Sequence, residues 1–229
     1  MRDCKLRGYI PLISNELNSL NSIIIVKENR MITLALTQIL IFSFTVISTE
    51  NGKNVEVLKD VEYSNVHGKS LKMDILIPNN PSKKPMPVVI WIHGGAWKTG
   101  NKKSGIQRLI PLVQQGYLSA SVEYRFSQEA KFPAQIEDCK CAVRFLRAKQ
   151  KEYNIDPNRI GVWGSSAGGH LASLLGTTGD IEELVGDREW KEYSSRVQAV
   201  FDMWGPTDFL KMNDFPGKID HDAPDSPES

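Results

Sequence analysis

The pentapeptide Gly164–Gly168, with the sequence GSSAG, constrains the fold of this chain more than any other stretch. It has the form G-x-S-x-G, which places a serine on a tight turn between a β-strand and an α-helix, with its hydroxyl exposed above the sheet. The flanking residues agree with this setting, because residues 159–163 are typical of a short strand and an apolar helical pattern begins directly after Ser166. The sequence therefore predicts a strand, a turn at Ser166 and a helix, in that order.

A second glycine turn lies upstream, at Gly94-Gly95. It follows Val88–Ile92, a continuous apolar run of the kind found in strands that are buried on both faces of a parallel sheet. Glycines suit such a turn because, without a Cβ, they let the backbone come close to a neighbouring group. Both turns follow predicted buried strands, which favours one common site over two unrelated turns.

From residue 55 onward, strand patterns and helix patterns alternate along the chain. Such alternation is typical of an α/β protein with a mostly parallel sheet flanked by helices. In the first predicted helix, at 104–115, Pro111 is tolerated if the helix proper begins near Gln107 or Arg108, since proline fits a first turn. In the second predicted helix, at 133–153, Lys and Arg side chains are expected to cover the face opposite the apolar one. The predicted strands are a hairpin at 55–63 and 71–77, then 88–92, 117–123, 159–163 and 197–204; the predicted helices are 104–115, 133–153 and one that ends near 176–179.

The stretch 31–48 carries no charge, follows Arg30 and ends in small polar residues. This layout is typical of a secretory signal peptide and predicts a secreted or periplasmic protein. A membrane anchor is one alternative, since about 18 apolar residues approach a spanning length; an ordinary buried helix is another, and would leave the protein cytoplasmic. Because signal peptides begin at the N-terminus, one hypothesis is that Met31 is the true start. We assign residues 31–49 to the signal or anchor and leave 1–30 as an unassigned extension.

The charge balance and the cysteines exclude several function classes. The 28 basic and 27 acidic residues give a net charge of +1 with no basic block, so nothing predicts a nucleic-acid partner. Cys4, Cys139 and Cys141 lack the spacing of a structural zinc site and are odd in number, which favours plain thiols over disulfides.

The two turns together supply the parts of a nucleophilic site. A serine hydroxyl attacks an ester only when a base takes its proton, and the oxyanion that forms needs hydrogen-bond donors. Ser166 is the predicted nucleophile. The N–H of Ala167, together with N–H groups of Gly94 and Gly95, is predicted to form the oxyanion hole.

At these residues the chain resembles the α/β-hydrolase esterases and lipases that carry an HGG oxyanion motif, the hormone-sensitive-lipase-like and feruloyl-esterase-like carboxylesterases. The resemblance covers about residue 55 to the end, within a domain at 50–229. It implies hydrolysis of a small-molecule ester without metal or cofactor. Membrane contact is expected only if residues 31–48, which lie outside the resemblance, are an uncleaved anchor. The motifs that carry it are His93-Gly94-Gly95-Ala96-Trp97, Glu123-Tyr124-Arg125, Phe132-Pro133-Ala134-Gln135, Asp138, Val162 to His170, and Trp204-Gly205-Pro206-Thr207-Asp208.

The acid and the base of the expected triad are harder to place. In this fold they follow the serine in the order Asp or Glu, then His. His93 belongs to the oxyanion loop, and His67 precedes the serine in a surface turn. His170 lies one turn along the same helix, where packing or hydrogen bonding is the favoured role. His221 remains as a base, with Asp208 as the acid.

Our preferred interpretation is that the chain is C-terminally truncated before its acid and base. Only 63 residues follow Ser166 in the 229-residue sequence, and they contain one clear strand. We therefore expect the isolated chain to be nearly inactive and the strand at 197–204 to form an unpaired apolar edge. Two other functions stay open: a serine peptidase of the same fold, and a non-catalytic, hydrolase-like binding module.

Overall fold

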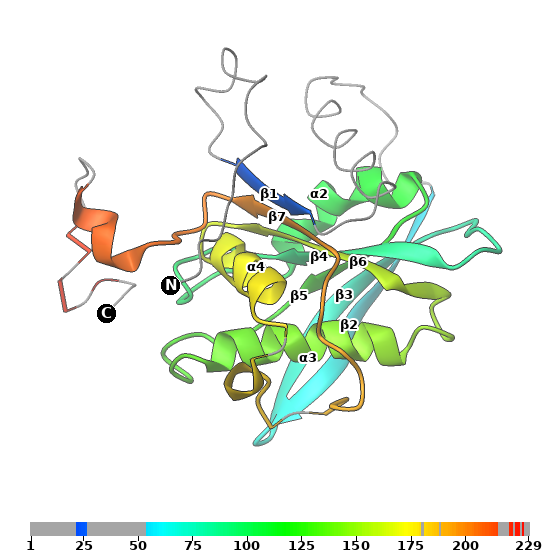
Figure 1. Ribbon diagram of the computed structural model, residues 1–229. Helices are drawn as coiled ribbons and strands as arrows, with labels where there is room; N and C mark the ends of the chain where they lie inside the picture. Colours follow the sequence, from blue (N-terminus) through cyan, green and yellow to red (C-terminus); the bar gives the residue numbers. More distant parts are fainter. Residues whose placement is uncertain are drawn as a thin grey trace, which may run out of the picture.

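A computed structural model describes residues 22–26 (backbone only), 54–179, 181–187, 189–214 and, beyond them, 220, 221, 223, 224 and 226. The predicted signal or anchor at 31–49 lies outside these residues. Within the described ranges, no helix is long and apolar enough to span a bilayer. The strands form one seven-stranded sheet in the order β1-β7-β6-β4-β5-β3-β2 (Figure 1).

The centre of the sheet is parallel, as the sequence predicted. β4 (Met86–Ile92) lies between β5 (Leu118–Val122) and β6 (Ile155–Ser165) and is parallel to both. β7 (Ala199–Met203) continues the parallel set beyond β6. The predicted hairpin is confirmed as β2 (Val55–Val66) and β3 (Lys69–Pro78), which pair antiparallel, with β3 joined to β5.

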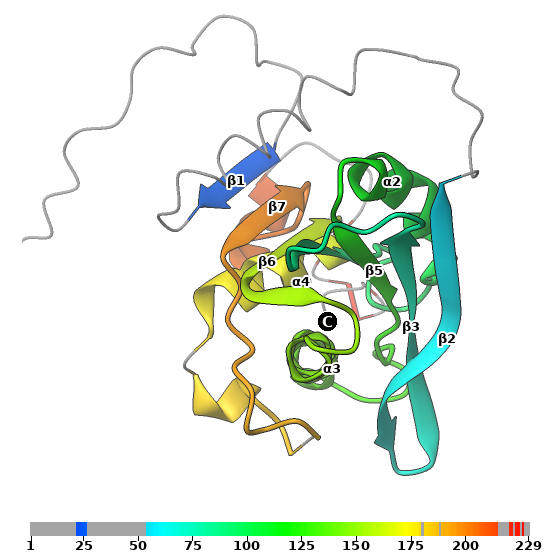
Figure 2. The same ribbon diagram turned by 90° about the vertical axis from the view of Figure 1, so that its right-hand side faces the viewer.

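Helices cover both faces of the sheet (Figures 1 and 2). α2 (Lys103–Gln114) lies on one face, where Leu109 and Val113 pack with Trp91 in a small apolar cluster. α3 (Ala134–Ala148) and α4 (Ala167–Thr177) lie on the other face, over a larger core. This arrangement confirms the prediction of an α/β fold.

One helix agrees with its predicted range and another is shorter. α2 begins at Lys103, close to the predicted start at residue 104, so Pro111 does not fall in a first turn that begins near residue 107. It lies inside the helix, and one backbone hydrogen bond is missing there. α3 ends at Ala148 rather than at residue 153. Beyond this end, the Tyr153 N–H still bonds to the Lys149 carbonyl. The residues after Ala148 therefore form a separate turn, although the sequence pattern predicted a helix that continued to residue 153.

The basic face of α3 is buried, contrary to expectation. Lys140 and Arg144 are 0% and 1% exposed, because the segment 178–196 covers them. Their side chains donate to backbone carbonyl oxygens, Lys140 to Thr178 and Arg144 to Val185. Burial lowers the pKa of Lys140, and the neighbouring Arg144 lowers it further. These cations therefore satisfy the carbonyls of an irregular segment instead of facing water.

The strand β1 (Ser22–Val26) lies in the N-terminal stretch for which no element was predicted. It pairs antiparallel with β7, with Ser22 opposite Met203 and Val26 opposite Ala199. The prediction of an unpaired edge at 197–204 is therefore wrong, because β7 has β6 on one side and β1 on the other.

Candidate active site

Ser166 is the single residue between the end of β6 and the start of α4. Its backbone has φ 55° and ψ −124°, a conformation that L-residues rarely adopt. Two backbone bonds hold it there: the Ser166 N–H donates to Met203 O at the end of β7 (2.7 Å), and its carbonyl accepts from the His170 N–H (3.0 Å). The side chain is exposed, so the predicted strand-turn-helix setting of Ser166 is confirmed.

Three glycines around the serine leave no room for side chains. A Cβ at Gly164 would lie 2.0 Å from Gly168 O, and one at Gly168 would lie 2.1 Å from Ile92 O. A Cβ at Gly169 would lie 2.1 Å from Asp202 Oδ1. Helix α4 can therefore approach the ends of β4, β6 and β7 only because these positions are glycine.

Asp202 supports the turn from β7. Its carboxylate is buried and accepts hydrogen bonds from Ser173 Oγ (2.7 Å) and from the Gly205 N–H (2.8 Å). These bonds tie the residues after β7 to α4, beside the carbonyl that holds Ser166. Sequence reasoning gave Asp202 no role, because nothing in the local pattern separates it from other strand residues.

The glycine loop, which contains Gly94-Gly95 and follows β4, lies directly against the serine turn at Gly164–Gly168. β4 and β6 are parallel neighbours with Ile92 opposite Gly164, so the residues that follow each strand emerge side by side. A Cβ at Gly94 would lie 2.6 Å from Ser165 O and 3.1 Å from Ser166 Cβ. The structure thus brings the two predicted motifs into contact.

His93 stiffens the start of the glycine loop. Its buried ring stacks on Tyr124 with centroids 4.5 Å apart, and its Nδ1 lies 2.8 Å from Gly94 O. Tyr124 Oη also donates to His93 O (3.0 Å). Burial lowers the pKa of His93 although the bond to Gly94 opposes this, so the ring is neutral at pH 7. A neutral ring that is held on both sides fixes the direction of the loop.

The other end of the loop is anchored by Lys102, which sequence reasoning missed. Its ammonium lies 2.8 Å from Asp60 Oδ1, 3.0 Å from Glu123 Oε1 and 3.7 Å from Asp74 Oδ1. Burial lowers the pKa of Lys102, but the hydrogen bonds to Asp60 and Glu123 raise it by more, so the net shift is upward. The partners come from three separate segments, and only the folded chain brings them together.

A buried ion pair holds the chain between β5 and α3. Arg125 donates from Nε and Nη2 to the two oxygens of Asp138, at 2.8 Å each, and its backbone N–H donates to the same carboxylate (3.0 Å). Arg125 Nη2 also reaches Ala134 O (3.1 Å). These contacts join Arg125 and Asp138, two residues of the motifs that carry the resemblance.

The candidate acid and base do not contact the serine. Among the described residues, Ser166 Oγ has no hydrogen-bond partner. Asp208 is 54% exposed and lies 3.8 Å from Lys211 Nζ, while the His221 N–H donates to Asn213 Oδ1. The assignment of Asp208 and His221 as acid and base stays a prediction.

His170 packs as expected, edge-on against Trp97 (5.4 Å between centroids) and against Phe209 (5.1 Å). Burial lowers its pKa, although the charge of Asp202 acts in the opposite direction.

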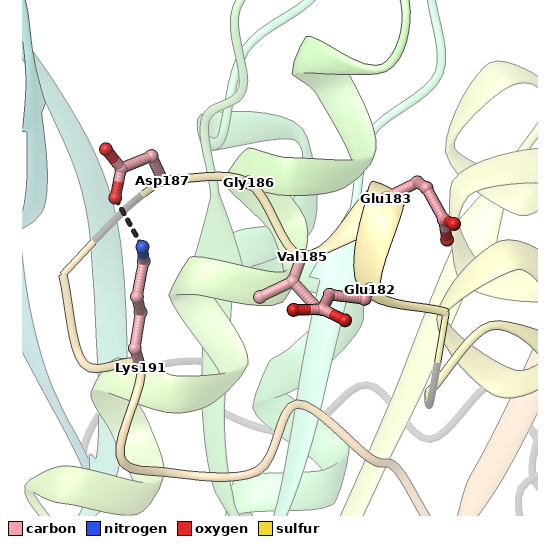
Figure 3. Close-up of a pocket in the computed structure, with 6 residues that line it drawn as sticks. All are labelled: Glu182, Glu183, Val185, Gly186, Asp187 and Lys191. Atoms are coloured by element: carbon pink, nitrogen blue, oxygen red, sulfur yellow. Dashed lines mark hydrogen bonds and ion pairs between the residues drawn. The ribbon is translucent and has the colours of Figure 1, made fainter.

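A groove of about 790 Å³ opens beside the serine turn, with His170 and Trp97 in its lining. A second hollow, shown in Figure 3, is lined by the segment after α4, including Glu182, Glu183 and Asp187, and by Lys191. None of its lining residues belongs to the serine turn or to the glycine loop. In the parts of the chain that the structure describes, no group of His, Cys, Asp and Glu side chains could hold a metal ion.

A strained serine between a strand and a helix, set against a glycine loop on a parallel sheet, defines an α/β-hydrolase. The comparison with known families agrees: the BD-FAE profile matches residues 73–229, and the chain belongs to that family.

Several relatives carry the names of esterases or carboxylic ester hydrolases. The probable carboxylic ester hydrolase LipM of Mycobacterium tuberculosis is 34% identical over 157 residues, which is 68% of this chain and 36% of LipM. Rat neutral cholesterol ester hydrolase 1 is 30% identical over 182 residues, 76% of this chain and 40% of that protein. The chain thus spans between a third and two fifths of the length of these relatives.

Solved structures give the same picture. A bifunctional GH43-CE protein of Bacteroides eggerthii is 34% identical with a TM-score of 0.61, over 69% of this chain and 22% of that one. A truncated carbohydrate esterase from gut microbiota is 29% identical with a TM-score of 0.61, over 72% of this chain and 61% of that one.

Proposed function

We propose that this chain carries the nucleophile and the oxyanion hole of a serine carboxylic-ester hydrolase. The observation that carries the proposal is the backbone of Ser166, held at φ 55° between β6 and α4 with Gly94 packed against it. Such strain persists only where the surroundings fix it, and it presents the hydroxyl clear of the sheet. The esterase names of the relatives support the same chemistry.

In the proposed mechanism, Ser166 Oγ attacks the ester carbonyl while a base removes its proton. The oxyanion that forms accepts hydrogen bonds from the Ala167 N–H and from N–H groups of Gly94 and Gly95. Ala167 is the first residue of α4, so the helix dipole adds partial positive charge at that point. The alcohol then leaves with a proton from the same base, and water hydrolyses the acyl-enzyme on Ser166.

The base decides how active the isolated chain is. In a serine protease whose triad members were removed one at a time, loss of the base lowers kcat on the order of 10⁶-fold. His221, paired with Asp208, is the candidate inside the chain. Because Ser166 Oγ contacts no described histidine, we expect hydrolysis barely above background.

The first test compares p-nitrophenyl acetate turnover by the 229-residue chain and by the variants Ser166→Ala, Ser165→Ala and His221→Ala. Near-background turnover supports a base from outside these residues. Robust turnover that falls with Ser166→Ala and His221→Ala, but not with Ser165→Ala, would instead assign the base to His221. Robust turnover that survives Ser166→Ala would overturn the proposed nucleophile.

A second test addresses the two alternative functions. In a longer form of the protein that contains a downstream Asp and His, a fluorophosphonate probe should label Ser166 and not the Ser166→Ala variant. Absence of labelling would favour the hydrolase-like binding module. Hydrolysis of peptides at a higher rate than matched esters would favour the peptidase.

We further propose, from the uncharged stretch 31–48, that the protein is exported before it acts. N-terminal sequencing of the mature protein tests this. A mature N-terminus near residue 50 supports a cleaved signal peptide, and an intact stretch supports an anchor or a buried helix.

A further inference from the structure

The groove beside the serine turn is fastened to both of the predicted motifs by backbone hydrogen bonds. The His170 N–H donates to Ser166 O (3.0 Å), and the Ser127 N–H donates to Trp97 O (2.9 Å). Both donor residues and Trp97 line the groove, and Trp97 follows Gly95 by two residues. One of the two substituents of an ester bound at Ser166 would therefore enter the groove.

Two exposed aromatic rings give the groove apolar walls. Phe132 is 60% exposed and Phe209 is 39% exposed, and both line the groove. The buried ring of Trp97 supports Phe209 at a centroid distance of 5.8 Å. Exposed aromatic faces offer apolar area to a ligand at low cost in side-chain entropy, so the walls suit a ring.

Gln135 gives the same groove a buried hydrogen-bond acceptor. It is 3% exposed and lies in the first turn of α3. Its Nε2 donates to Ala130 O (2.7 Å), which fixes the amide, because turning the amide over would place its oxygen against another oxygen. Oε1 therefore faces away from Ala130 O. It accepts no hydrogen bond from any residue that the structure describes, and it is not enclosed.

An acceptor in that position indicates a ligand or a water molecule as its partner. Buried side-chain polar atoms in native proteins nearly always have a hydrogen-bond partner, from the protein or from solvent. Of the described polar residues in the lining, Gln135 is the only buried one. Lys98 and Lys131 cannot take its place, because an ammonium group donates hydrogen bonds and accepts none. The groove thus combines apolar rings with a buried acceptor, a combination typical of small-molecule sites.

We propose that Gln135 determines the specificity of this groove for substrate rings that carry a hydroxyl group. The ring lies on Phe132 and Phe209, and the hydroxyl donates its hydrogen to Gln135 Oε1. The inference rests on the proposed esterase function for the placement of the ester at Ser166. An aromatic alcohol and a sugar share this chemistry. A neutral hydrogen bond of this kind contributes about a two- to tenfold gain in affinity.

The experiment measures binding to the Ser166→Ala form of the full chain, so it does not depend on hydrolysis. NMR titrations compare methyl 4-(hydroxymethyl)benzoate with methyl 4-ethylbenzoate, two neutral esters of similar size that differ in a hydroxyl against a methyl group. A sugar pair follows, 6-O-acetyl-1,5-anhydroglucitol and tetrahydropyran-2-ylmethyl acetate, which differ only in the ring hydroxyl groups. The quantity compared between variants is the affinity of the hydroxyl ligand divided by that of its partner without the hydroxyl.

Gln135→Met removes the acceptor, and Gln128→Met is the matched control. Gln128 lines the same groove, and its Nε2 also donates to a backbone carbonyl, Lys98 O (3.1 Å), but its side chain is exposed. Both variants therefore lose one amide and one hydrogen bond to the backbone. Phe132→Ala tests the wall, since it removes a ring and leaves the acceptor in place.

We expect Gln135→Met to lower the affinity ratio in at least one pair by about two- to tenfold, and Gln128→Met to leave it unchanged. Phe132→Ala should weaken both members of that pair equally. A role of Gln135 in folding alone would also weaken both members, so the ratio separates recognition from stability. The pair that responds identifies the ring as aromatic or as a sugar.

A direct measurement covers the case in which Gln135→Met does not fold. In the Ser166→Ala chain, the side-chain amide NMR signals of Gln135 should shift with the hydroxyl ligand and not with its partner. No such shift, an unchanged ratio in folded Gln135→Met, an equal loss in Gln128→Met, or no binding of any ligand would overturn the proposal. Labelling of Ser166 tests the esterase separately, so the two proposals can fail independently.

Discussion

Gly164 allows a sharp test of how the serine turn is built. A Cβ at this position would lie 2.0 Å from Gly168 O, 2.3 Å from Gly168 C and 2.8 Å from Gly169 N. All three atoms are backbone atoms of the first turn of α4, so no side-chain rotation relieves the overlap. The substitution Gly164→Ala therefore forces the helix away from β6.

The size of the effect follows from these distances. Ordinary contacts between carbon and its neighbours begin near 3.5 Å, so the first turn of α4 has to move by about 1.5 Å. It cannot move freely, because Gly168 already lies against Ile92 and Gly169 against Asp202. We expect a loss of about 3 kcal/mol in the free energy of unfolding, at the upper end of the usual cost of overpacking.

Gly161, on the same strand, provides the control. A Cβ there would meet nothing closer than Ala199 Cβ and Ala199 O at 3.6 Å, an ordinary contact. Gly161→Ala should be neutral or should stabilise by up to about 1 kcal/mol, because alanine restricts the unfolded chain. Urea denaturation followed by circular dichroism measures both variants. Equal stabilities, or a Gly164→Ala variant as stable as the parent chain, would refute the tight packing inferred for the turn.

Three further predictions concern the serine, the buried ion pair and the histidines. Ser166→Gly should raise the unfolding temperature relative to Ser166→Ala, because glycine relieves about 1–2 kcal/mol of strain at φ 55°; equal temperatures would show that the turn is unstrained. Arg125→Met should lower the unfolding free energy by about 3–5 kcal/mol by leaving Asp138 buried without its partner, and adding Asp138→Leu should recover much of that loss; a loss under about 1 kcal/mol in the single variant would contradict the role of the pair. Burial lowers the pKa of His170 below its ordinary value of 6.5, so the unfolded chain binds this proton first and stability falls as the pH drops below about 6.5. His170→Gln should weaken that decline in denaturation curves at pH 7 and pH 5, whereas His67→Gln, at an exposed turn, should not; identical declines in the parent chain and in His170→Gln would contradict the assignment.

The parts of the fold that sequence predicted are those with a local signature. The run Val88–Ile92 has no polar residue, so burial on both faces was the simplest interpretation, and β4 lies inside the sheet. The serine turn was predictable because the G-x-S-x-G spacing, its glycines, and the strand and helix patterns on either side of it all lie in one short stretch. Parallel pairing then brings Gly94 to Ser166, since both follow adjacent strands.

The parts that sequence missed depend on contacts between distant segments. Lys140 and Arg144 follow a helical period that reads as a solvated face, and only the later segment 178–196 turns that face inward. Lys102 likewise looks like a surface lysine until Asp60, Asp74 and Glu123 converge on it. A single-sequence pattern carries no information about which segment will cover a polar face.

The support of Ser166 shows that the geometry of the turn and the chemistry of the site depend on different parts of the chain. The Ser166 N–H bonds to Met203 O, and Asp202 ties the next residues to α4. The strained turn therefore requires β7 to be paired with β6, although β7 contributes no proposed reacting group. These hydrogen bonds at the turn come from residues no later than Gly205. The proton transfers, in contrast, require a base that contacts Ser166 Oγ, and the described residues supply none. A preformed turn in a chain with near-background turnover is thus the consistent expectation, and the stability of Gly164→Ala and the turnover of the parent chain test its two halves separately.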